Sequence, residues 1–165
     1  MQKLFTLSIL SFMMLAASCT GQSADASKTA KGIQNLMKTS TPGSVATTDN
    51  GFKMTAKIDG NDWAATEMMP PERAGRILGS INADYISMPF DRRSMVVGNK
   101  IKLGDGHGSV DIFMKDNLWS AKTGEMEITK VDEKSAGGKF YFTAGGFNSD
   151  KKMECTEGFF RILFK

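Results

Sequence analysis

Residues 138–146 read GKFYFTAGG, and their apolar side chains fall on every second position. Phe140, Phe142 and Ala144 alternate with polar or half-polar neighbours. Successive side chains of an extended strand point to opposite faces, so a period of two buries one face and leaves the other in water. We therefore expect a half-buried strand at this point, with Phe142 in the core.

The same alternation continues on both sides of this stretch. It recurs in FKMTAKID (52–59), ILGSI (77–81), YISMPF (85–90), KIKL (100–103), SVDIFMK (109–115), EMEITKV (125–131), KMECT (152–156) and FFRILF (159–164). The connecting segments INAD, GDGHG, EKSAGG, GGFNSDK and EG have turn or loop chemistry. Short strands at this spacing predict an all-β domain over residues 51–165, an antiparallel sandwich or barrel of about eight to ten strands.

The N-terminus has the features of an export signal. Residues 1–18 carry one charge, Lys3, followed by an apolar run and the small residues AAS. This run is shorter than the roughly 20 residues that span a bilayer, so it predicts a cleaved signal peptide. The small residues before Cys19 resemble the lipobox of bacterial lipoproteins, in which the cysteine is acylated and the chain is cut just before it. Ala16 stands where lipoboxes usually carry Leu. We expect lipidation at Cys19, with ordinary secretion as the alternative.

Residues 19–50 have the composition of a tether. Residues 20–50 contain no aromatic side chain and are rich in Ser, Thr, Ala, Gly and Lys. Such a segment buries too little apolar surface to offset its ordering entropy. We predict a flexible tether that contains at most a short helix over residues 24–38.

Only two cysteines occur in the sequence, too few for a disulfide-stapled domain. The predicted strand around Cys155 favours a small buried hydrophobic side chain there. The alternatives are a reactive thiol, or a disulfide to Cys19 if that residue is not acylated.

The strand pattern also carries a family resemblance. The opening FKMTAKIDGNDWAA, the strand GKFYFTA of "GxFxFxA" type and the last segment TEGF of "TxGxF" type are its motifs. Together they resemble an uncharacterised family of bacterial envelope lipoproteins over about residues 51–165. The resemblance implies a lipid-anchored β-sandwich with a last hairpin of TxGxF type at Thr156–Phe159, which would turn between KMECT and FFRILF. It implies no activity and no catalytic residue.

The sequence offers little for catalysis or metal binding. The single histidine, His107, lies between glycines in GDGHGS and reads as a solvated turn residue. Asp105, His107 and Asp111 fall short of the ligand sets of calcium and zinc sites. No nucleophile motif such as GxSxG is present. We predict no catalytic residue, no metal and no cofactor, and we attribute most of the methionines after the signal to the core.

A cluster of arginines is the best candidate for a binding surface. Four of the five arginines are Arg73, Arg76, Arg92 and Arg93. A hairpin of ILGSI and YISMPF across INAD would bring PPERAGR and DRRS together at its open end. Guanidinium groups suit carboxylate, phosphate or sulfate groups, so we predict an anionic glycan or protein partner here. The alternative is a solvated rim neutralised by nearby acids.

The predicted function follows from the address and the architecture. A net charge of +3 without a basic run argues against nucleic acid. We expect a protein of the bacterial cell envelope, anchored by lipid to a membrane on its periplasmic or surface side, that acts as a binding or accessory module. The alternatives are a structural or assembly subunit of an envelope complex and, less favoured, a hydrolytic enzyme.

Overall fold

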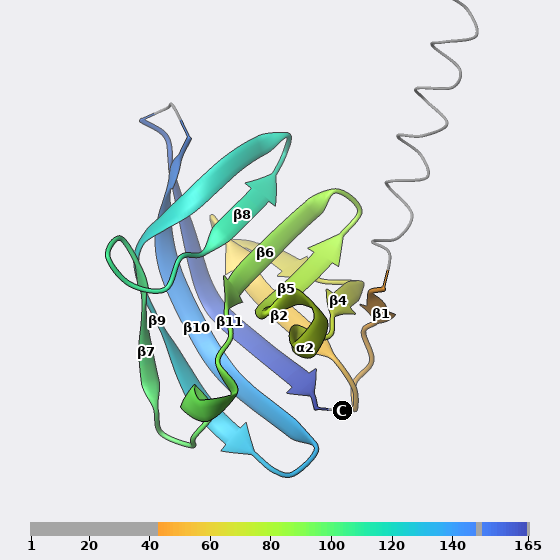
Figure 1. Cartoon of the computed structure of the whole chain (residues 1–165). Coiled ribbons are helices and arrows are strands. Elements are labelled where there is room, and N and C mark those ends of the chain that lie inside the picture. Colours follow the sequence, from red (N-terminus) through yellow and green to blue (C-terminus); the bar gives the residue numbers. More distant parts are fainter. Residues whose placement is uncertain (1–42, 148–149, 165) are drawn as a thin grey trace, which may run out of the picture. The chain divides into compact units, whose positions relative to one another are not determined.

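The computed structural model describes residues 43–147 and 150–164, which form one antiparallel sheet of 11 strands (Figure 1). The prediction of an all-β antiparallel fold is confirmed, and the sheet curls into a half-barrel around an apolar core. The predicted signal peptide (1–18), Cys19 and the helix over 24–38 lie outside the described residues. Within the described residues, no helix is both long and apolar enough to cross a membrane.

Most of the strands lie where the alternation predicts them. In chain order they are β1 (Val45–Ala46), β2 (Lys53–Ile58), β3 (Asn61–Ala64), β4 (Glu67–Met69), β5 (Arg76–Ile81), β6 (Asp84–Pro89), β7 (Lys100–Gly104), β8 (Asp111–Met114), β9 (Asn117–Val131), β10 (Ser135–Gly146) and β11 (Lys152–Leu163). A helical turn α2 (Pro71–Ala74) precedes β5, and a 3-10 turn η1 (Arg92–Ser94) follows β6. The strand β1 lies inside the stretch predicted as tether. Val45 and Ala46 pair with β4, so the end of that stretch belongs to the sheet.

The order of the strands explains why the sheet curls. Neighbours along the sheet run β1-β4-β5-β6-β8-β9-β10-β11-β2-β3, and β7 also pairs with β9. The segment 61–69 joins the two ends of this path. The Ala65 N–H donates to Met54 O on β2, and the Thr66 N–H donates to Ser80 O on β5. The chain therefore changes partners at a bend, which is how a strand turns a corner between packed sheets.

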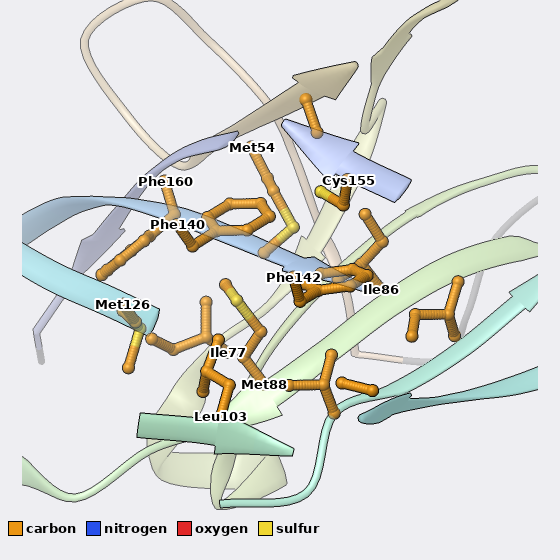
Figure 2. Packing of buried hydrophobic residues seen from close by; sticks show 14 of the residues in the cluster. Met54, Ile77, Ile86, Met88, Leu103, Met126, Phe140, Phe142, Cys155 and Phe160 are labelled. Atoms are coloured by element: carbon orange, nitrogen blue, oxygen red, sulfur yellow. The ribbon is translucent and has the colours of Figure 1, made fainter. Parts of the chain in front are cut away.

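The concave side of the sheet holds the core (Figure 2). Phe140 and Phe142 stack with ring centroids 6.2 Å apart and are 2% and 1% exposed. Met54, Met88 and Met126 are fully buried beside them, which confirms that these methionines serve packing. The expected burial of Phe142 is thus borne out.

The C-terminal hairpin implied by the family resemblance is wrong. KMECT and FFRILF are the two halves of one strand, β11, which pairs with β10 along its length. Glu157 (φ 51°) forms a bulge there instead of a turn, because three residues of β11 face two of β2. Gly158 makes the bulge possible, since a Cβ at this position would collide with the Phe140 ring and carbonyl.

One other predicted boundary also moves. The segment Ser135–Gly138, predicted as part of a loop, is the buried start of β10. Gly138 fits because a side chain would collide with the Glu127 carbonyl and the Phe160 ring. The hairpin of β5 and β6 forms as predicted, closed by the pair Ile81 and Asp84 across a two-residue turn.

Candidate functional site

Three hairpin turns surround a pocket at one end of the curled sheet. It has a volume of about 410 Å³ and is bounded by the β2–β3, β5–β6 and β8–β9 connections. We call it the Trp pocket, and its polar and aromatic lining consists of Asp59, Asn61, Asp62, Trp63, Asp84, Lys115 and Trp119. Ile58, Met114 and Met153 supply apolar wall. The mouth of a curled β-sheet is a common place for a ligand site.

Strand register turns both tryptophans toward the inner face. Trp63 on β3 lies opposite Ala56, and Trp119 on β9 lies opposite Ile112. Directly paired residues of antiparallel strands share a face, and Ala56 and Ile112 are both buried in the core. The chain has only two tryptophans, and the fold brings both to this pocket.

The indole N–H groups are the least satisfied polar groups of the site. Nε1 of Trp63 and Nε1 of Trp119 are both buried without a hydrogen-bond partner in the described part of the chain. Buried donors are nearly always paired, because an unpaired one costs about 1–3 kcal/mol. Both nitrogens are inaccessible to solvent, so each tryptophan offers the pocket its partly exposed ring and not its N–H group.

Two carboxylates of the lining are held in place by backbone groups. Asp59 Oδ1 accepts from the Glu154 N–H at 2.8 Å, and Asp84 Oδ1 accepts from the Lys115 N–H at 3.1 Å. The Oδ2 atom of each has no hydrogen-bond partner among the described residues. The pocket thus presents fixed acceptors beside the two indole rings.

One residue of the lining has a strained backbone. Asp59, Lys115 and Asp116 have φ of 49°, 52° and 60°, in the left-handed region, which Asp tolerates and Lys rarely adopts. Lys115 and Asp116 together make the tight β8–β9 turn without a glycine. Strained residues persist where the surrounding structure fixes them, and they cluster at ligand sites.

The four candidate arginines do not share a partner. The Arg76 guanidinium donates to Ser87 O at 2.9 Å and Ser109 O at 2.8 Å, and it pairs with Asp111 at 3.1 Å. These bonds tie β5, β6 and the start of β8 together. Arg76 therefore serves the fold.

The other three arginines contact separate parts of the surface. Arg73 Nη1 donates to Gly43 O at 3.4 Å, and the Arg92 guanidinium lies 3.2 Å from the centroid of the Phe164 ring. Arg93, whose side chain is 95% exposed, lies 3.9 Å from Asp91. The predicted anionic-ligand site on Arg73, Arg76, Arg92 and Arg93 stays a prediction.

A second groove of about 470 Å³ crosses the outer face of β9, β10 and β11. Its aromatic side chains are Tyr141 and Phe159. Two of its three carboxylates already have partners: Lys100 lies 3.2 Å from Glu125, and Lys57 lies 2.8 Å from Glu157. The hydrogen bond to Glu157 and the attraction of its charge raise the pKa of Lys57. Satisfied charges on an open face make this groove the weaker candidate.

His107 and Cys155 lie where the sequence predicts them. The His107 side chain is exposed in the turn between β7 and β8, where the backbone N–H of this residue donates to Gly104 O. No group of three or more His, Cys, Asp or Glu side chains within the described residues is arranged to hold a metal ion. Cys155 is 1% exposed, and burial raises the pKa of its thiol to about 12. It is a packing residue.

Sequence reasoning missed the Trp pocket, although a signal was present. Each tryptophan closely follows an Asp/Asn turn, in NDW (61–63) and in DNLW (116–119).

No protein-family model, curated protein or solved structure matches this chain.

Proposed function

We propose that this protein is a binding module of the bacterial envelope, tethered to a membrane by lipid on Cys19, and that its ligand occupies the Trp pocket. The export signal and the small residues before Cys19 support the location in the envelope and the lipid anchor. The tether composition of residues 20–50 supports a domain held at a distance from the membrane.

One observation carries the binding role. The partly exposed side chains of Trp63 and Trp119 line the same pocket as Asp59 and Asp84. A backbone N–H holds the Oδ1 atom of each carboxylate, and each Oδ2 atom has no partner among the described residues. A few fixed polar groups in a largely apolar concavity are typical of small-molecule sites.

Intrinsic tryptophan fluorescence tests the binding role directly. Both tryptophans of the chain line the pocket, so any ligand that enters it changes the emission. We expect at least one small-molecule fraction of an envelope extract to change the emission of the mature chain saturably. Trp119→Phe should weaken that response, whereas Tyr141→Phe on the outer face should leave it unchanged. If no fraction changes the emission, the binding role is wrong.

Membrane partition and intact mass test the anchor. A thioether-linked diacylglycerol with an amide-linked chain would hold the protein on a membrane, since stable anchoring takes more than one acyl chain. We expect the mature chain to be heavier than residues 19–165 alone, and Cys19→Ser to be released or to stay uncleaved. A mass equal to residues 19–165 less two hydrogens would mean a disulfide to Cys155 and would contradict the anchor. The burial of Cys155 argues against that bond.

A further inference from the structure

The hydrogen-bonding groups of the Trp pocket restrict the chemistry of its ligand. The free oxygens of Asp59 and Asp84 only accept, and the indole N–H groups of Trp63 and Trp119 are buried out of reach. A ligand that satisfies the two carboxylates must therefore offer hydrogen-bond donors. Hydroxyl and ammonium groups are such donors.

The apolar lining adds a second restriction. The faces of two indoles together with Met114 and Met153 offer flat apolar surface beside the polar groups. A pyranose ring has an apolar C–H face and an edge of hydroxyls, so it can pack on an indole while its edge exchanges hydrogen bonds. A volume of about 410 Å³ is within the usual range of small-ligand sites and accommodates a mono- or disaccharide.

The charge of the pocket excludes one class of sugar. Asp59, Asp62 and Asp84 face a single cation, Lys115, in the lining. Asp62 makes no hydrogen bond within the described residues, and its charge attracts Lys57, which lies opposite it on β2. A ligand carboxylate, phosphate or sulfate would meet a net negative field, whereas a neutral or amine-bearing ring would not.

We propose that the Trp pocket binds a neutral or amine-bearing sugar ring and rejects sugar acids. This inference rests on the proposed function and names its ligand class. The ring stacks on Trp63 or Trp119, and its hydroxyl or ammonium groups donate to Asp59 and Asp84.

The test is a series of three ligands that differ in charge at one group. Methyl β-glucoside, glucosamine and glucuronate are titrated into the mature chain, held in a detergent that contains no sugar, and tryptophan emission is followed. We expect saturable changes with the first two and about tenfold weaker binding of glucuronate, because one added anion meets the excess negative charge.

Matched variants remove charge without removing structure. Asp84→Asn keeps an oxygen that accepts from the Lys115 N–H, and Asp59→Asn keeps the acceptor for Glu154 in a left-handed position that Asn tolerates. Each should reduce the difference in dissociation constant between the glucoside and glucuronate. Each should also leave the unfolding midpoint close to that of the unmodified chain. Asp150→Asn serves as a control, since this exposed acid is not part of the pocket lining, and should leave the difference in dissociation constant unchanged.

Other outcomes overturn the sugar class and leave the binding role intact. Glucuronate binding as tight as the glucoside would refute the charge argument. A response to choline chloride with none to any of the three sugars would show a site for organic cations. An envelope fraction that changes the emission while all three sugars fail would also refute the sugar class. If no envelope fraction changes the tryptophan emission, the proposed function itself is refuted.

Discussion

The arginine-rich stretch between residues 73 and 93 and the Trp pocket differ in how far their polar groups are already satisfied. Arg76 uses its guanidinium on two carbonyls and a carboxylate of its own chain. In the Trp pocket, Asp59 and Asp84 each use one carboxylate oxygen on a backbone N–H, and the second oxygen of each has no partner among the described residues. Arg76 is thus committed to the fold, whereas the Trp pocket keeps polar atoms available to a ligand.

The largest effect should come from the core beneath both regions. Phe142 is 1% exposed and stacks on Phe140, so Phe142→Ala should cost about 3–5 kcal/mol of unfolding free energy. Chemical denaturation measures this loss. Since this core supports both regions, a cost under about 1 kcal/mol would mean that the concave side is not packed as described.

Arg76 should contribute more to stability than the arginines around it. Arg76→Ala leaves two carbonyls and Asp111 without their guanidinium partner, which should cost about 1–3 kcal/mol. Arg93→Ala is the matched control, because that side chain is 95% exposed and should change stability by at most about 0.5 kcal/mol. Equal effects in the two variants would remove the distinction between a structural and a solvated arginine.

In the Trp pocket, a substitution should affect ligand binding more than it affects stability. Trp119→Phe removes a buried unpaired donor, and this gain offsets the lost ring area, so stability should change by about 1 kcal/mol or less. Saturable binding in the fluorescence assay should weaken about tenfold or more, because the ligand loses stacking surface. A variant that binds as well as the unmodified chain would place the ligand elsewhere.

The smallest effect concerns Cys155. Burial raises the pKa of its thiol to about 12 from a value of 9.0 in an open chain. The folded state thus keeps a proton that the unfolded state loses above pH 9, so this group favours unfolding increasingly as pH rises from 9 toward 12. Below pH 9 it should have no influence on stability.

The measurement is a comparison of unfolding free energies at pH 8 and pH 10 with those of Cys155→Ala. Other groups titrate in this window in both chains, so only the difference in slope reports on Cys155. The unmodified chain should lose more stability on alkalinisation. Identical slopes would contradict the burial of the thiol.

Local pattern was sufficient to predict much of the sheet. Alternation identified the buried faces of β2 and β10, and the Asn82-Ala83 turn identified the β5–β6 hairpin, because both signals act between near neighbours. The short strands β3 and β4 were missed, since three or four residues cannot display a period. The bulge at Glu157 was taken for a turn because its reason, the Phe140 ring over Gly158, lies on another strand.

The candidate site was less predictable than the fold. The tryptophans, Asp84 and Lys115 come from three hairpins, and only the order of strands around the curled sheet brings them together. The Asp/Asn turns before each tryptophan marked the two positions but not their proximity. Conversely, Arg92 and Arg93 are adjacent in sequence yet contact different residues, Phe164 and Asp91.

The most direct test of the Trp pocket as the ligand site is a proton–nitrogen correlation spectrum of the mature chain during titration with methyl β-glucoside. The two tryptophans give two indole N–H signals, and the Arg76 Nε–H, which donates to Ser87, gives a third reporter. The account predicts that both indole signals shift saturably with one dissociation constant while the Arg76 signal stays in place. Unmoved indole signals together with a shifting Arg76 signal would contradict it.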